Sequence, residues 1–399
     1  MNMTKKKIAF LTMSVAFLMT LLGGALFGQA SSKTSIYRPL SIFTEVFDLV
    51  RSNYVEPVTS DQLLDGAFSG VTDAIDEFSY YVPPAQMTTY KSFTDTDDNG
   101  TGLIVSRRFG YAYVISAVPG SPAAKAGVER GDFIDKIDGK STTKMAVWQM
   151  KNALAASHPV ELSVLHGGQT KREPFKLDHT NFHPVNVATK QFGNVAVITI
   201  PYFDKGTEGQ FRAALDNVRK AGTRKLIVDV RGNAAGDIDE AITSADDLLT
   251  SGLITSLEGR KIEMKKWQAD RNTAYDGDVE VLTDASTAAG GEIFAAAIHG
   301  NSRGKTVGVT TYGKSIVQKF ITLPSGGGVY MTVAHYTTPD LKPIKDGGVK
   351  PDVLVDLSAQ AIRDPNNKNT AAEPREDLIM EKALSLYGEN MTVAPKKAA

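Results

Sequence analysis

Residues 281–294, with the sequence VLTDASTAAGGEIF, have the pattern of a turn that carries a catalytic nucleophile. The pattern predicts a buried strand, a sharp turn of small residues and a helix that begins near Glu292. Many hydrolases place an attacking serine at the tip of such a turn. Here the tip carries Ala288 and Ala289, and neither methyl group can attack a carbonyl carbon.

Two hydroxyl groups lie near this tip in the sequence. Ser286 is three positions before Ala289, on the entry side of the turn, and Thr287 follows it. Serine and threonine at such positions usually make turn or capping hydrogen bonds. We therefore expect structural roles for both residues.

Other catalytic classes find little support in the chain. None of its six histidines lies in a recognisable Ser-His-Asp setting, and the absence of cysteine excludes thiol chemistry. His179 and His183 have the spacing of a helical metal pair, but Pro184 favours extended chain there. The triplet at 326–328 lacks the lysine and helix of a phosphate loop and predicts a hairpin turn. We predict no metal and no cofactor.

The composition is that of a globular protein with two or three domains. The 399 residues are 42% hydrophobic and 22% charged, and the formal net charge is −1. Charges of both signs are interspersed, so nothing favours a nucleic-acid partner.

The second half of the chain alternates between predicted strands and helices. Strands are predicted at 195–200, 225–230 and 280–283, and helices near 209–221, 238–249 and 292–298. This alternation predicts a layered α/β domain with a mostly parallel sheet. A polar linker at 364–374 precedes a last amphipathic helix near 378–387.

The N-terminus predicts export. Lysines at 5–7 precede an apolar run at 8–27 that contains no charged residue, and about 20 helical residues cross a hydrocarbon core of roughly 30 Å. We favour an uncleaved membrane anchor over signal-peptide cleavage after Ala30, and both over a buried soluble helix. Apolar residues at helical spacing then predict two short helices within 41–76.

The middle of the chain resembles a PDZ domain. The stretch 118–140, VPGSPAAKAGVERGDFIDKIDGK, matches its small helix and the strand that follows. In such domains a peptide C-terminus adds as an edge strand, and the backbone N–H groups of a glycine-bearing loop hold its carboxylate. A small β-barrel that serves as a spacer is the alternative. The matching loop consists of Gly100, Thr101, Gly102, Leu103 and Ile104.

Residues 41–357 as a whole resemble the carboxyl-terminal processing peptidases, which are exported serine peptidases with an inserted PDZ domain. The matching motifs are NYVEPV at 53–58, LIVDVRGNAAG at 226–236, YGKSIVQ at 312–318, TTP at 337–339 and GGVKPDV at 347–353. The resemblance implies an anchor or signal peptide (1–30), an N-terminal helical part (31–95), a PDZ domain (96–178), an α/β peptidase core (179–360) and a polar linker with a C-terminal helix (361–399).

The resemblance also implies a serine nucleophile with a lysine as its base. Lys314 matches the catalytic lysine, and Gln318 matches the glutamine that orients it. A lysine accepts a proton only when neutral, so its pKa must fall from about 10.4. We expect both side chains on one face of a strand, because strand side chains repeat every two positions.

The family pattern has its nucleophile three positions before a glutamate. Counted from Glu292, that position is Ala289, and a methyl group forms no acyl-enzyme. The resemblance assigns the oxyanion N–H groups to Ala235, Gly236 and Gly290. Alanine stands at 235 where the family has glycine, and its Cβ restricts positive φ, so we expect a misaimed N–H there.

Two origins account for Ala289, an engineered serine-to-alanine change and natural drift. Further departures at Ala235, Gly290, Gly291 and Ser315 favour natural drift. Two functions follow. The first is a tail-specific serine peptidase that is inactive in this form or uses an unrecognised hydroxyl. The second is a non-catalytic module that binds the C-terminal tails of exported proteins. Either is expected in a bacterial cell envelope, anchored in the cytoplasmic membrane with its domains outside, and no oligomeric state is predicted.

Overall fold

The computed structural model describes residues 13–15, 19, 37–93, 100–166, 172–178, 182, 187–270, 273–345, 347–357 and 377–391. The chain divides into two compact units, residues 1–67 and 68–399. The first unit contains helix α2 (Tyr37–Asn53) and the start of α3 (Ser60–Asp73), which ends in the second unit. These are the two helices predicted within 41–76, and α2 buries none of its residues.

No helix among these described residues is long and apolar enough to cross a membrane. Most of the predicted anchor at 8–27 lies outside the residues that the structure describes.

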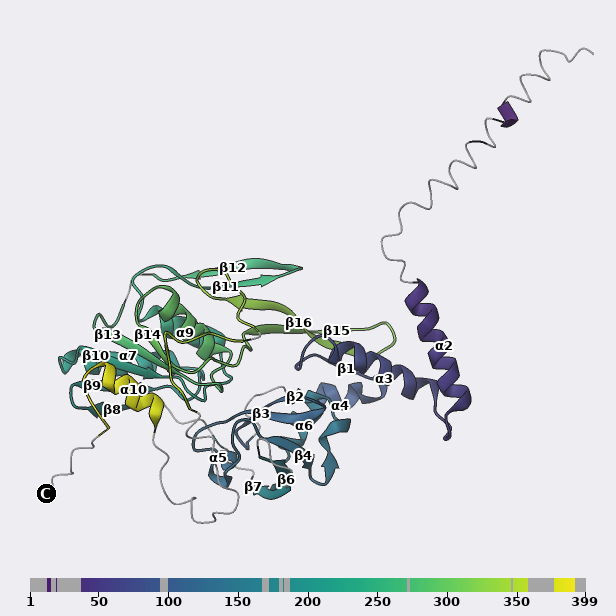
Figure 1. Ribbon diagram of the computed structural model, residues 1–399, viewed down its shortest axis with the longest axis horizontal. Coiled ribbons are helices and arrows are strands. Elements are labelled where there is room, and N and C mark those ends of the chain that lie inside the picture. The colour runs from purple at the N-terminus through teal and green to yellow at the C-terminus, as the bar shows by residue number, and fades with distance from the viewer. Residues whose placement is uncertain are drawn as a thin grey trace, which may run out of the picture. The chain divides into compact units, whose positions relative to one another are not determined.

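The second unit contains a PDZ-like sheet with the strand order β2-β3-β4-β6-β7, in which β5 pairs with β4. Helices α5 (Pro122–Ala126) and α6 (Val147–Leu154) accompany this sheet (Figure 1). Its buried core is aliphatic and includes Val114, Ile134 and Val164. The strands are β2 (Leu103–Arg108), β3 (Tyr111–Ala117), β4 (Phe133–Ile137), β5 (Lys140–Ser141), β6 (Val160–Leu165) and β7 (Arg172–Leu177).

A second sheet has the order β17-β14-β13-β10-β9-β8 and is parallel except for β8. This confirms the predicted α/β core with its mostly parallel sheet. The strands are β8 (Ala188–Phe192), β9 (Val195–Thr199), β10 (Lys225–Asp229), β13 (Asp278–Thr283), β14 (Lys305–Gly308) and β17 (Val353–Leu354).

Helices cover both faces of this sheet. Helices α7 (Thr207–Lys220), α8 (Ile238–Asp246) and α9 (Gly290–Gly300) share one apolar core with it, and α10 (Leu378–Leu386) packs in a separate apolar cluster. The strands are buried on two faces, which explains their nearly continuous apolar sequences.

A third, antiparallel sheet has the order β1-β16-β11-β12, with β15 paired to β16. The connection between β15 and β16 is a tight hairpin turn, as the triplet at 326–328 predicts. The strands are β1 (Tyr80–Val82), β11 (Leu253–Gly259), β12 (Ile262–Gln268), β15 (Ile316–Thr322) and β16 (Gly328–Thr337), and the short helices are η1 (Pro84–Gln86), α4 (Met87–Ser92) and η2 (Thr142–Lys144).

Candidate active site

Strand β13, the turn at 284–289 and helix α9 form the predicted sharp connection, which we call the elbow. Ala289 directly precedes α9 and has φ 48° and ψ −117°. A residue with a Cβ rarely adopts positive φ, and holding it there costs about 1–3 kcal/mol. Backbone strain is therefore stored at the position that the sequence assigns to the nucleophile. Strain of this kind exposes the attacking atom in hydrolase elbows.

Asp284 fixes the elbow from its entry side. Its Oδ1 accepts the N–H groups of Ser286 and Thr287 at 3.0 and 2.8 Å. The Thr287 hydroxyl lies 3.1 Å from the Val230 carbonyl oxygen and so links the elbow to the end of β10. This is the structural role predicted for Thr287. Ser286 lines a separate cleft of about 700 Å³, away from the pocket that holds Lys314.

Glu292 organises the segment at 311–315, which we call the lysine loop. Glu292 is fully buried, and its Oε1 accepts the Gly313 N–H at 2.6 Å and the Thr311 hydroxyl. Its Oε2 accepts the Lys314 N–H at 2.8 Å and the Ser315 hydroxyl at 3.1 Å. Burial raises the pKa of Glu292, and these four donors oppose that rise. The first turn of α9 thus holds the backbone of Lys314 beside the elbow.

Phe78 contacts both Lys314, the predicted base, and Gln318, the residue expected to orient it. The Lys314 Nζ lies 5.2 Å from the centre of the Phe78 ring, and the Gln318 amide donates to the Phe78 carbonyl oxygen at 3.2 Å. Lys314 lies in the loop before β15, and the pairing of β15 has a bulge between Val317 and Gln318. The expectation that both stand on one strand is therefore wrong, although both line the same pocket.

The loop at 232–236, which we call the oxyanion loop, follows β10. The positive φ values in it belong to Gly232 and Gly236, at 73° and 118°, and Ala235 is not among the positive-φ residues. This agrees with the expected restriction of φ by the Ala235 Cβ, and the misaiming of its N–H stays a prediction. A Cβ on Gly236 would lie 2.1 Å from the Phe203 carbonyl oxygen, so this position requires glycine.

Gly290 begins α9, and its N–H lies at the helix N-terminus, where the resemblance places an oxyanion donor. The next N–H groups, of Gly291 and Glu292, donate to the Ala288 and Ala289 carbonyl oxygens at 3.0 and 3.2 Å. A Cβ added to Gly290 would lie 2.9 Å from the Ala241 Cβ, and one added to Gly291 would lie 2.9 Å from the Asn233 carbonyl oxygen. The surrounding packing is therefore fitted to glycine at both positions. Gly290 and Gly291 are matched to their neighbours in this chain, which the sequence alone could not indicate.

One pocket of about 250 Å³ brings the predicted catalytic residues together. The elbow provides Ala289, the lysine loop provides Lys314 and β15 provides Gln318. The other lining residues are Lys151, Ala234, Ala235, Gly236, Ile238, Ile316 and Tyr330. Lys151 belongs to the PDZ helix α6, and no sequence motif pointed to it.

The PDZ strands β2 and β3 lie against the oxyanion loop and the elbow. Ile104 and Ile115 belong to the same apolar cluster as Ala235 and Ala288. In the predicted peptide-binding loop, Thr101, Leu103 and Ile104 are buried, while Gly100 and Gly102 have positive φ values of 70° and 73°. The Gly102 carbonyl oxygen accepts the Val118 N–H at 2.9 Å, and the Thr101 carbonyl oxygen accepts the Ala123 N–H at 3.1 Å.

A polar cluster also joins the PDZ strand β2 to the lysine loop. The Tyr312 hydroxyl lies 3.1 Å from the Ser106 hydroxyl and 3.2 Å from Arg108 Nη2. Arg108 also pairs with Glu77, and the Tyr312 hydroxyl donates a hydrogen bond to Glu77 Oε1. These residues are distant in sequence and were not predicted.

The described residues contain no group of three or more acidic, histidine or cysteine side chains that could hold a metal ion. His179 and His183 lie outside the described residues.

Comparisons with known proteins agree with this geometry. Residues 194–355 match the model of peptidase family S41, and residues 113–165 match a PDZ domain model. A carboxy-terminal-processing protease of Bartonella bacilliformis is 29% identical over 88% of this chain and 83% of its own length. A probable CtpA-like serine protease of Staphylococcus aureus is 28% identical over 79% of this chain, which spans 65% of that protein.

Among solved structures, a photosystem II D1 C-terminal processing protease superposes with a TM-score of 0.66 at 23% identity. The match covers 79% of this chain and 92% of that protein, and it shows a shared fold. Residues 194–355 therefore match an S41 peptidase domain and residues 113–165 a PDZ domain, and the chain is similar over most of its length to carboxyl-terminal processing peptidases.

Proposed function

We propose that this chain binds protein C-terminal tails and presents them to a serine-peptidase pocket that lacks its nucleophile. The observation that carries the proposal is the conformation of Ala289. It has the strained backbone of an elbow residue and lines the pocket that also contains Lys314 and Gln318. A serine side chain at this position would share that pocket with the lysine amine, as a serine–lysine mechanism requires.

In the complete reaction, Lys314 would take the proton of the serine hydroxyl as that oxygen attacks the peptide carbonyl. Gln318, held by the Phe78 carbonyl oxygen, would help to orient the amine. The N–H groups of Gly290, Ala235 and Gly236 would stabilise the negative oxygen that forms. With alanine at 289 the substrate binds, and no acyl-enzyme follows.

The test is to replace Ala289 by serine. Removal of a catalytic serine lowers kcat by about 10⁶ in a serine peptidase, so A289S should raise cleavage of a substrate with an apolar C-terminus by roughly 10⁴-fold or more. The double variant A289S/K314M is the matched control and should return to the level of the unmodified chain. Unchanged tail affinity with no cleavage by A289S would refute the assignment of this pocket.

A second candidate is a peptidase that uses Ser286. Its position in a separate cleft disfavours this reading. Labelling of the unmodified chain by a fluorophosphonate, abolished in S286A, would support the second candidate and contradict the first.

We also propose that the chain is exported and anchored in a bacterial cytoplasmic membrane, with its domains outside. The lysines at 5–7 and the uncharged apolar run at 8–27 support this location. Recovery of the full chain in the soluble fraction of cells, without an N-terminal cut, would contradict it.

A further inference from the structure

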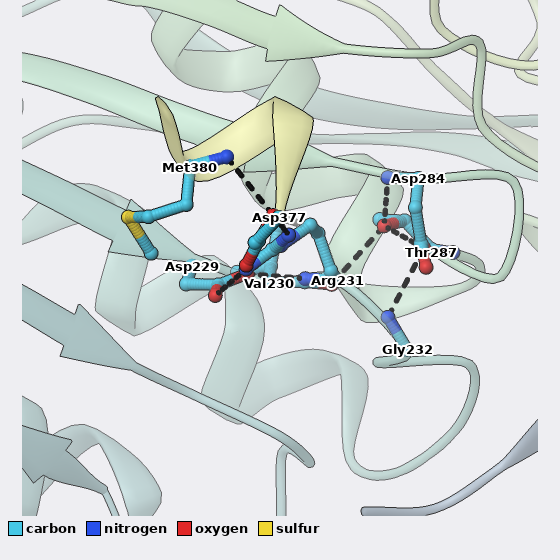
Figure 2. Close-up of polar contacts among 8 residues, drawn as sticks. All are labelled: Asp229, Val230, Arg231, Gly232, Asp284, Thr287, Asp377 and Met380. Carbon is cyan, nitrogen blue, oxygen red and sulfur yellow. Dashed lines mark hydrogen bonds and ion pairs between the residues drawn. The ribbon is translucent and has the colours of Figure 1, made fainter. Parts of the chain in front are cut away.

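A cluster of charged residues joins the C-terminal helix to the strand that leads into the oxyanion loop (Figure 2). Arg231 Nε and Nη2 bind Asp229 at 2.8 and 2.7 Å. The same guanidinium binds Asp377 through Nη1 and Nη2 at 2.6 and 2.9 Å. Arg231 therefore makes paired hydrogen bonds to two carboxylates, an arrangement that fixes the guanidinium in orientation as well as in position.

Asp377 also begins helix α10. Its Oδ1 accepts the Met380 N–H at 3.0 Å, which is the capping contact at the helix N-terminus. One carboxylate thus caps α10 and holds Arg231. This double contact links the start of α10 to the end of β10.

Helix α10 is attached to the sheet along its length. Met380 and Leu384 are buried in a cluster with Ile227 and Leu282. At its far end, Lys225 Nζ donates to the Tyr387 carbonyl oxygen at 2.8 Å, and the Tyr387 hydroxyl donates to the Leu226 carbonyl oxygen at 3.3 Å. The helix therefore contacts β10 at both ends, and its N-terminal contact lies at the last residues before the oxyanion loop.

Arg231 is followed directly by Gly232, the first residue of the oxyanion loop. The Gly232 N–H donates to Asp284 Oδ1 at 3.0 Å, and Figure 2 shows that this carboxylate also holds Thr287 of the elbow. Further along, the Ala288 N–H donates to the Asn233 carbonyl oxygen at 2.8 Å. The oxyanion loop and the elbow are thus bonded to each other, one residue beyond Arg231.

We propose that Asp377 is a positioning residue for the active-site pocket, which acts through Arg231 to hold the oxyanion loop against the elbow. The C-terminal helix then serves the pocket as well as covering a face of the sheet. This proposal rests on the proposed function, which identifies the pocket as a peptidase active site. The exchange measurement below does not require turnover.

The experiment separates capping from positioning. Serine is also a good cap, but its side chain is too short to reach Arg231, so D377S keeps the helix and removes the pairing. Hydrogen–deuterium exchange of the otherwise unmodified chain, followed by mass spectrometry, should show exchange at 231–236 and 285–290 that is at least about tenfold faster in D377S. Exchange at 378–387 should change by less than about twofold. D377N keeps the cap and loses the charge, so its exchange at 231–236 and 285–290 should be faster than in the unmodified chain and slower than in D377S.

Asp276 provides a matched control, since it pairs with Arg224 at 2.8 Å on an exposed surface. D276N should leave exchange unchanged at both loops. Unchanged loop exchange in D377S would overturn the proposal. Equal acceleration in the loops and in α10 would also overturn it, because Asp377 would then only dock the helix.

A kinetic measurement in the A289S background tests the consequence. Loss of oriented N–H donors acts on the transition state, so adding D377S should lower kcat by about tenfold or more and change KM by less than about twofold. A change confined to KM would contradict the proposal. If A289S itself shows no turnover, the proposed function fails, and the exchange result still decides the role of Asp377.

Discussion

Glu280 and Glu292 are both buried glutamates, one on β13 and one in the first turn of the helix that follows it. Their exposed fractions are 4% and 0%. Glu292 accepts hydrogen bonds from four groups of the lysine loop. In contrast, Glu280 Oε2 has no hydrogen-bond partner within the described part of the chain. Burial raises the pKa of Glu280 to about 7, and the charge of Lys305 opposes this rise.

The difference teaches what a buried carboxylate contributes. A buried charge costs free energy unless hydrogen bonds replace the water that it loses. Glu292 recovers part of that cost. Its donors are four of the five residues of the lysine loop, so satisfying the carboxylate also fixes the path of that loop. Glu280 lies within β13, four residues before the elbow, and recovers little. The same residue type therefore positions a loop from the first turn of α9 and destabilises the protein from within β13.

The largest effect is expected from breaking the satisfied member of this pair. E292Q presents an amide NH₂ to donors that need acceptors, so at least one N–H of the lysine loop loses its partner. We expect a loss of about 2–4 kcal/mol in the free energy of unfolding, measured by urea denaturation. In the A289S background, E292Q should also abolish most of the restored cleavage.

The control for E292Q is E263Q, at an exposed position of β12. It should change stability by less than about 0.5 kcal/mol. Equal stability of E292Q and E263Q would show that the four hydrogen bonds do not hold the loop.

The second effect concerns Glu280 and has the opposite sign. The native state keeps this proton up to about pH 7, whereas the unfolded chain releases it near the ordinary glutamate pKa of 4.5. The contribution of Glu280 to stability is thus fully present below about pH 4.5 and is lost as pH rises to 7. E280Q should stabilise the protein by about 1–2 kcal/mol at pH 8 and by much less at pH 4.5.

Urea denaturation at both pH values measures this difference. In E280Q the free energy of unfolding should still fall with rising pH, but less steeply, because burial also raises the pKa of Asp247 to about 7. An equal change at both pH values would contradict the assignment of a raised pKa to Glu280.

The fold class and the central residues of the site could be predicted from the sequence, because short contiguous patterns of residues indicate them. Alternating strands and helices indicated the parallel sheet, and the small-residue turn indicated the elbow. The positions of Ala289 and Lys314 followed from the resemblance to the carboxyl-terminal processing peptidases, whose motifs are short contiguous stretches. In each of these cases the signal is local in the sequence.

The features that were missed depend on contacts between distant segments. The pairing of Arg231 with Asp377 joins residues 146 apart, and Asp377 directly follows a polar stretch that the sequence presents only as a linker. In the sequence, Glu292 was used only as the position from which the nucleophile position was counted. Nothing in the sequence shows that its carboxylate reaches the lysine loop. The φ values of the oxyanion loop could not be predicted either, because the family pattern gives residue types but not φ values.

The smallest expected effect comes from removing one of the four donors to Glu292. Ser315 is fully buried, and its hydroxyl lies 3.1 Å from both Glu292 Oε2 and the Ala289 carbonyl oxygen. A hydroxyl has a single proton, so Ser315 satisfies one acceptor at a time, and S315A should cost only about 0.5–1.5 kcal/mol by urea denaturation.

The double variant S315A/E292Q makes this prediction sharper. If the Ser315 hydroxyl acts mainly on Glu292, the two losses overlap, and the double variant should be less destabilised than the sum of the single variants by about 0.5 kcal/mol or more. Strict additivity would instead mean that the hydroxyl serves the Ala289 carbonyl. Ser315 would then belong to the elbow, and Glu292 would hold the lysine loop through its backbone N–H groups and Thr311 alone.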